Sequence, residues 1–488
     1  MKKILLVGGT GAIGMYLAPY LLKEGFQVYI TSRSDRRSTD SNLFYLRGNG
    51  KDIKWLDELS IEYTFDAIVD FMMYTTYELK SRIEKLLTFS SHYIFLSSYR
   101  SLAGEIPLND DSLRKIDLIN SNPIYKDDLY GLRKGKQEDL FIESSNKNWT
   151  IVRPPMTFSK NRFQFGAMDN WDVVRAVRGG TSVLPEGMWL TSTTLVYGKD
   201  VALMISKLVL NKRAYGKSFN LGTKENYTWQ EISDIYNRIF GLKVSKIISN
   251  KEYTTLTNQT GAMIDRLLTR VFDNDKLLAV TGLKDEDFYS LEKGLKEAWG
   301  DSDIQFFKNT NHGVALHAKF DIVSGVDTKL CELPESIRKI YFIARERERR
   351  IYNNSVKLQG YEVTTINDYF WRVTQNDESV RVTTINKQSN VSGNSWVSFK
   401  LPNSLKEQQN YSALLSVNCN VEAKVRLFFH GSGERNQVVT YLDIKKGTNY
   451  LKFKFTSDFR WQYFALTRND FNQQNVDLEF WEISIKEE

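Results

Sequence analysis

The chain opens with a glycine-rich turn set directly between two regular elements. An apolar run of strand length, Ile4-Leu5-Leu6-Val7, leads straight into Gly8-Gly9-Thr10-Gly11-Ala12-Ile13-Gly14, and a helical pattern follows. Glycines in such a turn let an anionic ligand approach the backbone, and the free N–H groups at the start of the helix attract it. This context predicts a dinucleotide site, whose contacts we expect from Gly8, Thr10, Gly11, Ala12, Ile13 and Gly14.

Strand and helix patterns alternate over residues 1–155. We expect strands at 3–7, 27–31, 42–46, 67–71, 92–97 and 150–153, with helices between them at 13–23, 54–59, 77–88 and 130–144. Such alternation is typical of a Rossmann-type α/β fold, a doubly wound parallel sheet with helices on both faces. Shorter helices at 171–178, 199–210 and 229–240 suggest that residues 156–300 form a substrate-binding part over the carboxyl edge of the sheet.

The pattern changes after residue 300. Short alternating runs at 395–399, 424–429 and 450–455, separated by turn clusters at 431–433 and 446–449, predict an antiparallel β-sandwich or jelly roll over 366–488. Residues 301–365 are expected to form a connector, with a strand at 338–344, a helix at 345–360 and a strand at 361–367. The aromatic side chains of the sandwich fit its core, and the alternative is a surface that binds glycan or a partner protein. They include Trp371, Trp396, Trp461, Tyr463 and Trp481.

Composition narrows the class of protein. The 488 residues are 41% hydrophobic and 26% charged, as in soluble globular proteins, and we find no apolar run of about 18 residues that would span a membrane. The two cysteines give no disulfide framework and favour the cytoplasm. With four histidines and no clustered cysteines, we expect no metal site. The net charge of +7 is mild for this length, so nucleic acid is not the favoured partner.

Tyr130 and Lys134 lie four residues apart at the start of an expected helix. Side chains with this spacing project from one helix face, one turn apart. A nearby ammonium favours the phenolate, which makes the phenol a usable general acid or base beside a carbonyl or an alcohol. The spacing gains weight from its order in the chain, after the glycine turn and after two serines, Ser97 and Ser98, at a strand end.

These motifs together resemble the extended short-chain dehydrogenase/reductase family, of the nucleotide-sugar epimerase, dehydratase and reductase type. The resemblance covers about residues 1–300. It is carried by the glycine turn, Phe95-Leu96-Ser97-Ser98, Tyr130 with Lys134, Val152-Arg153-Pro154-Pro155, the segment 195–202, and Phe219-Asn220-Leu221-Gly222 with Tyr227-Thr228-Trp229. It implies that Tyr130 exchanges a proton with the substrate, that Lys134 binds the nicotinamide ribose and tunes Tyr130, and that a hydroxyl near Ser98 holds the same substrate oxygen.

The family's catalytic hydroxyl would align with Tyr99, so Ser98 is the residue expected in that role, with Ser97 next; the alternative for Ser98 is a bond to its own loop. The resemblance also implies cofactor contacts from Phe71, Pro154 and the Asp52-Ile53 pair, and substrate contacts from Ser98, Tyr99, Arg153 and Arg178. Many dehydratases of the family carry an Asp-Glu pair where this chain has Arg100-Ser101, so dehydration is not expected.

The end of the second strand bears on cofactor choice. NAD sites want a carboxylate there, whereas this chain has Ser32 and Arg33, followed by Arg36 and Arg37. A guanidinium suits a 2′-phosphate, so we expect NADP, with NAD as the alternative and Asp35 as a competing ribose contact. The expected function is a cytoplasmic oxidoreductase or epimerase of a nucleotide-linked sugar, for surface-polysaccharide synthesis, working as a homodimer. The alternatives are a non-catalytic dinucleotide- or RNA-binding protein and a scaffold.

Overall fold

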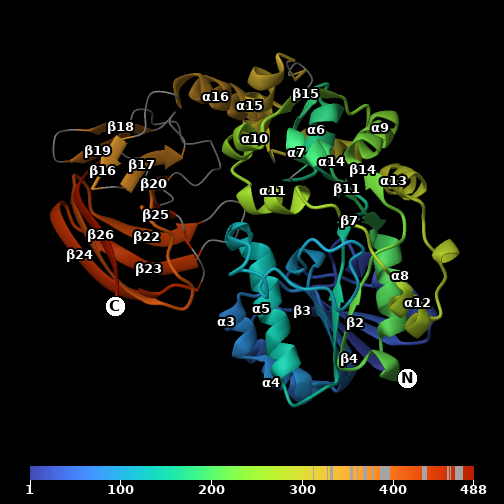
Figure 1. Ribbon diagram of the computed structural model, residues 1–488. Coiled ribbons are helices and arrows are strands. Elements are labelled where there is room, and N and C mark those ends of the chain that lie inside the picture. The colour runs from blue at the N-terminus through green and yellow to red at the C-terminus, as the bar shows by residue number, and fades with distance from the viewer. Residues whose placement is uncertain are drawn as a thin grey trace. The chain divides into compact units, whose positions relative to one another are not determined.

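The computed structural model divides the chain into two compact units. Met1–His312 and Phe320–Glu332 form the N-terminal unit, and Gly313–Lys319 with Leu333–Glu488 form the C-terminal unit. The structure describes residues 1–166, 168–311, 313–326, 328–329, 333–351, 356–359, 361–366, 371–375, 379–384, 396–430, 437–458, 461, 463–467 and 476–488. Figure 1 labels the helices and strands of both units.

A seven-stranded sheet forms the centre of the N-terminal unit, and every neighbouring pair in it is parallel. Its strands lie in the order β13-β6-β5-β4-β1-β2-β3, so the direction of winding reverses beside β1. Ligand crevices of such sheets open at this reversal. The strands are β1 (Lys3–Val7), β2 (Gln27–Ser32), β3 (Leu43–Arg47), β4 (Phe65–Asp70), β5 (Ser90–Leu96), β6 (Trp149–Arg153) and β13 (Lys217–Asn220). The predicted doubly wound α/β fold is confirmed.

Alternate residues of β1 face opposite sides of the sheet, as its pleat requires. Ile4 and Leu6 pack in one buried cluster with side chains of α1 and α8, whereas Leu5 and Val7 pack in another with α2, α4 and α5. Both faces are therefore covered (Figure 1), which is why these strands are continuously apolar. The covering helices are α1 (Gly14–Lys23), α2 (Ile53–Glu62), α3 (Thr76–Lys80), α4 (Ile83–Thr88), α5 (Leu129–Glu143), α8 (Gly198–Leu208) and α12 (Asp275–Thr281).

The single helix expected at 77–88 is wrong, because the structure has two, α3 and α4. The carbonyl of Glu78 accepts hydrogen bonds from the Ser81 hydroxyl at 3.0 Å and from Arg82 Nε at 2.6 Å. Side chains thus take the place of the next helical N–H groups, and the helix stops at Lys80.

The rest of the N-terminal unit builds a second, smaller core around Phe163, Phe240 and Trp229. Its strand pairs are β7 (Met156–Phe158) with β12 (Leu195–Tyr197), β8 (Gln164–Phe165) with β9 (Met168–Asp169), β10 (Ser182–Pro185) with β15 (Val244–Ile248), and β11 (Ser192–Thr193) with β14 (Tyr227–Thr228). Its helices are α6 (Trp171–Val177), α7 (Glu186–Trp189), α9 (Trp229–Phe240), α10 (Asn250–Thr257), α11 (Thr260–Arg266), α13 (Leu291–Gly300) and α14 (Ile304–Asn309).

Two antiparallel sheets form most of the C-terminal unit. Phe399 of β20 packs edge-to-face on Phe480 of β26, and Phe429 of β22 meets Phe455 of β24, so the sheets share one core. One sheet has the order β16-β17-β20-β25-β22-β23 and the other β18-β19-β26-β21-β24. Their strands are β16 (Val356–Leu358), β17 (Tyr361–Ile366), β18 (Trp371–Gln375), β19 (Val380–Thr384), β20 (Trp396–Lys400), β21 (Asn410–Cys419), β22 (Ala423–His430), β23 (Gln437–Ile444), β24 (Gly447–Thr456), β25 (Tyr463–Thr467) and β26 (Asp477–Glu487). The predicted sandwich is confirmed.

The connector differs from the prediction. The strand expected at 338–344 is wrong, because α16 (Glu335–Ile351) occupies it, after α15 (Val314–Ser324). Ile337, Tyr341 and Ala344 are buried, and their spacing of three and four residues is helical rather than alternating. The helix expected at 345–360 is confirmed as far as Ile351, where α16 ends, but it is wrong at 356–358, where the structure has β16, and the strand expected at 361–367 is confirmed as β17. Of the turn expected at 446–449, only Lys446 lies between β23 and β24, because β24 already begins at Gly447, whose φ is +98°. The turn expected at 431–433 lies outside the described residues.

Candidate functional site

The glycine turn has the geometry of an anion cradle. Gly8 adopts a φ of +71°, and its N–H donates to the Thr31 hydroxyl at 2.7 Å. A Cβ added at Gly14 would lie 2.3 Å from the Gly9 carbonyl oxygen, so only glycine lets α1 start so close to the turn. A Cβ at Gly11 would meet no atom within 4 Å, and Thr10 and Gly11 are exposed. The backbone is thus open to a ligand, which fits a diphosphate.

A cavity of about 380 Å³ lies at the carboxyl edge of the sheet. Residues predicted from separate motifs meet on its wall: Ile13 of the glycine turn, Phe71, Ser98, Tyr99, Tyr130, Lys134 and Pro154. Met156, Thr157, Arg162, Gln164, Asp169 and Arg266 line it from the smaller core. Met72 and Met73 also line the cavity.

Tyr130 stands at the start of α5, where the Asp128 carboxylate accepts a hydrogen bond from Gly131 N–H at 3.1 Å. The guanidinium carbons of Arg100 and Arg133 lie 4.9 Å and 5.5 Å from the centre of its ring, a range in which cations are attracted to an aromatic face. Within the described residues, the Tyr130 hydroxyl has no hydrogen-bond partner. It is therefore available to a ligand in the cavity.

Lys134 lies one helical turn after Tyr130 and is buried, with 4% of its surface exposed. Its Nζ donates to the Leu96 carbonyl at 2.7 Å and lies 4.9 Å from the ring centre of Phe95. Burial, and then the charge of Arg133, lower the pKa of Lys134 to about 7, against the opposing pull of Asp70 and Glu138. The surroundings of Lys134 thus disfavour its protonated form.

Asp70 ends β4 below the cavity and is the nearby acid that sequence reasoning missed. It accepts hydrogen bonds from the hydroxyls of Tyr93 at 2.6 Å and Tyr74 at 2.9 Å and from Met72 N–H at 2.8 Å. Burial raises its pKa despite these bonds. A carboxylate in this position favours the charged form of Lys134.

The three hydroxyls after β5 have different surroundings. Ser98 accepts from Arg100 N–H at 3.3 Å and lines the cavity, so its own-loop bond and a ligand contact are compatible. Ser97 donates to Glu138 and also lines the cavity, so its role as second choice stays a prediction. The Tyr99 hydroxyl donates to Asp265 at 2.5 Å and accepts from Arg266 at 3.2 Å. The side chain that aligns with the family's catalytic hydroxyl is therefore held by its own surroundings.

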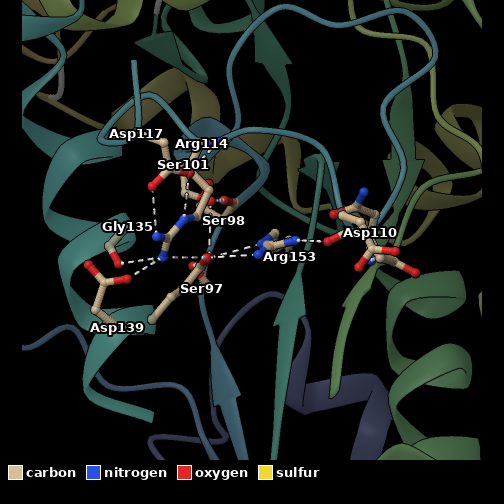
Figure 2. Close-up of polar contacts among 12 residues, drawn as sticks. Ser97, Ser98, Ser101, Asp110, Arg114, Asp117, Gly135, Asp139 and Arg153 are labelled. Carbon is tan, nitrogen blue, oxygen red and sulfur yellow. Dashed lines mark hydrogen bonds and ion pairs between the residues drawn. The ribbon is translucent and has the colours of Figure 1, made fainter. Parts of the chain in front are cut away.

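Arg153, predicted to contact substrate, is part of a buried polar network. Its Nε and Nη2 donate to Glu138 at 3.0 Å and 2.8 Å, and its Nη1 donates to the Asp110 carbonyl at 3.0 Å. Figure 2 shows Arg153 between Asp110 on one side and Ser97 on the other. Arg153 is not among the residues that line the cavity, and its contact with substrate stays a prediction. Glu138, which the motifs did not indicate, organises this network.

Arg178, the other predicted substrate arginine, is also turned to the protein. It follows α6, and its Nη2 donates to the carbonyls of Lys308, at 3.1 Å, and Thr310. These carbonyls end α14 and carry the negative end of its dipole. Arg178 is not among the residues that line the cavity, and its contact with substrate also stays a prediction.

The end of β2 keeps the pattern that favoured NADP. Ser32 is buried and donates to the Ser34 carbonyl at 2.9 Å. Arg33, Arg36 and Arg37 are exposed. Asp35, the competing ribose contact, pairs with Arg47 at 2.9 Å. The adenine contacts stay predictions: Asp52 caps α2 by accepting from Lys54 N–H at 3.0 Å, and Ile53 lines a separate groove of about 310 Å³ between α2 and α4.

Arg100 and Arg266 are site residues that the sequence alone did not reveal. They come from the loop after β5 and from the end of α11, and both line the cavity beside Tyr130. No local spacing links residues so far apart in the chain. Of the predicted sandwich aromatics, Trp461 is 3% exposed and Trp481 36%, while the side chains of Trp371 and Trp396 lie outside the described part.

The fold and this cavity define the class of protein as a Rossmann-type α/β unit that resembles the extended short-chain dehydrogenases/reductases. Residues 4–85 match the model of the NAD dependent epimerase/dehydratase family, which confirms the resemblance drawn from the motifs. Across the described residues, no helix is long and apolar enough to cross a membrane.

The chain is similar to a chloroplast stem-loop binding protein of 41 kDa (b) from Arabidopsis thaliana, with 25% identity over 262 residues, which make up 51% of this chain and 65% of that protein. Among solved structures it is similar to Pal from Bacillus thuringiensis, at 16% identity and a TM-score of 0.49 over 61% of this chain and 98% of that one. A UDP-glucose 4-epimerase from Bifidobacterium longum, solved with NAD⁺ and UDP, matches at 15% identity and a TM-score of 0.47 over 62% and 98%.

Proposed function

We propose that this protein is an NADP-dependent oxidoreductase or epimerase of a nucleotide-linked sugar. The observation that carries the proposal is the meeting of Tyr130, Lys134 and Ser98 on one cavity wall with Ile13 of the glycine turn. A site with this composition can hold a dinucleotide and a small alcohol or ketone side by side. The proposed setting is surface-polysaccharide synthesis in the cytoplasm, where the content of only two cysteines fits a reducing compartment.

The chain's own residues divide the work. The backbone of Thr10, Gly11 and the first turn of α1 would hold the diphosphate, and Arg33 would face the 2′-phosphate. A bound nicotinamide dinucleotide supplies the hydride acceptor or donor. Tyr130 would exchange a proton with the substrate oxygen, because it lines the cavity and its hydroxyl has no partner among the described residues.

Lys134 and Ser98 would support that proton transfer. The Lys134 ammonium, fixed on the Leu96 carbonyl, would bind ribose oxygen and favour the phenolate. Ser98 would donate its hydroxyl proton to the same substrate oxygen while it accepts from Arg100 N–H. Arg100 and Ser101 stand where the family's dehydratases carry acids, so we do not propose elimination of water.

Tyr130→Phe tests the proposal against the exposed Tyr77→Phe as a matched control. Turnover of nucleotide sugars with NADP is expected to fall about 100-fold or more in Tyr130→Phe, because general acid–base catalysis is lost. NADP binding, measured by fluorescence titration, should persist in both variants. Undiminished turnover in Tyr130→Phe would remove the mechanism, and absence of dinucleotide binding in the unaltered protein would remove the function.

A second candidate function is RNA binding. The observation that favours it is the similarity to a protein named for binding a stem-loop. A filter-binding assay with a stem-loop RNA over a range of salt concentrations tests it. Salt-dependent retention of RNA, together with no turnover of nucleotide sugars, would favour this function over the first.

A further inference from the structure

A buried cluster of charges with more cations than anions lies directly beneath the cavity. We define the Asp128–Asp265 cluster as these two acids with Arg100, Lys115, Arg266 and Arg270. Arg100 contacts Asp128 at 2.5 Å, Lys115 pairs with Asp128, and Asp265 pairs with Arg266 at 2.7 Å and with Arg270 at 2.8 Å. Among the described residues, the ion pairs of these four cations run only to these two acids.

The cluster carries more positive than negative charge even when Lys115 is counted as neutral. Burial lowers the pKa of Lys115, against the pull of Asp128 and Asp265. Burial would raise the pKa of Asp265, but Arg270, Lys115, Arg266 and Arg100 hold it well below its usual range. Burial would also raise the pKa of Asp128, but Arg100 and Lys115 lower it. Both acids are therefore charged, and three guanidiniums, which stay protonated, outnumber them even if Lys115 is neutral.

Two of these guanidiniums have donors without a partner among the described residues. Arg100 uses Nη2 for Asp128, and its buried Nε has no partner. Arg266 uses Nε for the Gly166 carbonyl and Nη1 for Asp265 and Tyr99. The other terminal nitrogens, Arg100 Nη1 and Arg266 Nη2, have no partner within the described chain, and both arginines line the cavity. Uncompensated buried charge is costly, so an anion entering here would be stabilised.

The cavity wall as a whole also carries more cationic than anionic side chains. Its charged side chains within the described residues are Arg100, Lys134, Arg162, Arg266 and a single acid, Asp169, which pairs with Arg162 at 2.9 Å. Arg162 is thus neutralised at the rim, with 37% of its side chain exposed, whereas Arg100 and Arg266 are not. The anion site is therefore the side of the cavity formed by these two arginines.

Arg100 lies close to Tyr130, and this closeness indicates which part of a substrate carries the anionic group. The guanidinium carbon of Arg100 lies 4.9 Å from the centre of the Tyr130 ring, and the phenol must reach the reacting oxygen at hydrogen-bond distance. A group held by Arg100 is thus a near neighbour of the reacting carbon. We propose, resting on the proposed function, that the substrate is a nucleotide-linked sugar acid whose carboxylate is held by Arg100, with Arg266 beside it.

Pairs of nucleotide sugars that differ only at C6 test this. With the full-length protein saturated with NADP⁺, calorimetry would compare UDP-glucuronic acid with UDP-glucose and GDP-mannuronic acid with GDP-mannose. In one pair the acid is expected to bind at least about tenfold more tightly, the scale of one charge-assisted hydrogen bond. Arg100→Gln should abolish that difference, and Arg100→Lys should keep part of it.

The controls distinguish a sugar carboxylate from the diphosphate as the anion that Arg100 holds. They also distinguish failure of this inference from failure of the proposed function. Arg162 lies on the same wall but is paired with Asp169. Arg162→Gln should therefore change the affinities for the acid and for the neutral sugar by the same factor. If Arg100→Gln weakens both sugars equally, Arg100 holds the diphosphate and the inference is overturned. Equal affinities of the unaltered protein for the acid and the neutral sugar in both pairs overturn the inference too, and this measurement does not need Arg100→Gln to fold. Turnover of the neutral sugar would then still support the proposed function. If no nucleotide sugar binds, both proposals fail.

Discussion

Glu138 accepts two hydrogen bonds from the guanidinium of Arg153, from Nε at 3.0 Å and from Nη2 at 2.8 Å, and both side chains are buried. Ser101 donates to the same carboxylate at 3.0 Å. The pair ties α5, which carries Tyr130 and Lys134, to the end of β6. The distance between the candidate acid–base helix and the sheet edge therefore depends on this carboxylate.

Glu138→Gln should destabilise the protein strongly. The substitution leaves the buried Arg153 charge without its counter-ion, which costs about 3–5 kcal/mol in comparable buried pairs. Urea unfolding followed by tryptophan fluorescence measures the shift in midpoint. Arg238→Gln, which breaks an exposed pair with Glu292, is the control and should leave the midpoint unchanged. Similar midpoints for both variants would contradict this account of the network.

Two glycine substitutions separate folding from dinucleotide binding. Gly14→Ala should lower both stability and NADP affinity, because its Cβ would lie 2.3 Å from the Gly9 carbonyl oxygen. Gly11→Ala should fold normally, since its Cβ meets no atom within 4 Å, but should weaken NADP binding about tenfold by intruding on the cradle. Thermal unfolding and fluorescence titration give the two readouts. Full affinity in Gly11→Ala would place the diphosphate elsewhere.

Arg33→Ala should reduce the preference for NADP over NAD. The exposed guanidinium at the end of β2 is expected to pair with the 2′-phosphate, and losing one charge-assisted bond weakens NADP binding about tenfold. NAD affinity should stay the same. Arg47→Ala is the control, because Arg47 is engaged with Asp35 and should leave the ratio of the two dissociation constants intact. If the ratio of the two dissociation constants is the same in Arg33→Ala and in the unaltered chain, Arg33 does not contact the 2′-phosphate and the argument for NADP over NAD fails.

Lys134 makes stability depend on pH in a definite direction. Its folded-state pKa is about 7, lowered from 10.5 chiefly by burial. Between these values the unfolded chain binds the extra proton, so the free energy of unfolding rises with pH. Lys134→Met should lack this rise, which amounts to about 2 kcal/mol between about pH 6 and about pH 9.

Urea unfolding of both proteins at several pH values measures the difference. Lys80→Met, at an exposed position of α3, provides the control and should follow the unaltered protein. Parallel pH curves for Lys134→Met and the unaltered protein would mean that Lys134 is not titrating near neutral pH.

The sequence predicts the features that local spacing encodes. The strand, turn and helix of residues 3–23 lie within a residue of their expected bounds, because the apolar run, the glycines and the helical period all act over a few residues. Tyr130 and Lys134 share a cavity for the same reason. The motif order also brings Ser98 to that wall, since the carboxyl ends of parallel strands meet at one edge.

Long-range charge pairing explains what the sequence did not reveal. Arg153 was expected at the substrate, but its partner Glu138 lies on α5 and takes its charge. Arg100 and Arg266 acquire their place only when Tyr99 bonds Asp265, a contact between residues 166 positions apart. No periodicity records such a pair. The position of Glu138, four residues after Lys134, is the one local signal that a helix-face argument could have used.

The strand β24 has a consequence for how the C-terminal unit behaves in a crowded solution. In the order of the described strands it ends its sheet, with β21 as its neighbour, so one row of its backbone groups lacks a strand beside it. Lys452 and Lys454 are exposed along it, and Lys454 pairs with Glu488. Ammonium groups repel a second molecule that approaches edge to edge. The exposed ammonium of Lys452 on this strand would therefore disfavour edge-to-edge pairing with a second molecule.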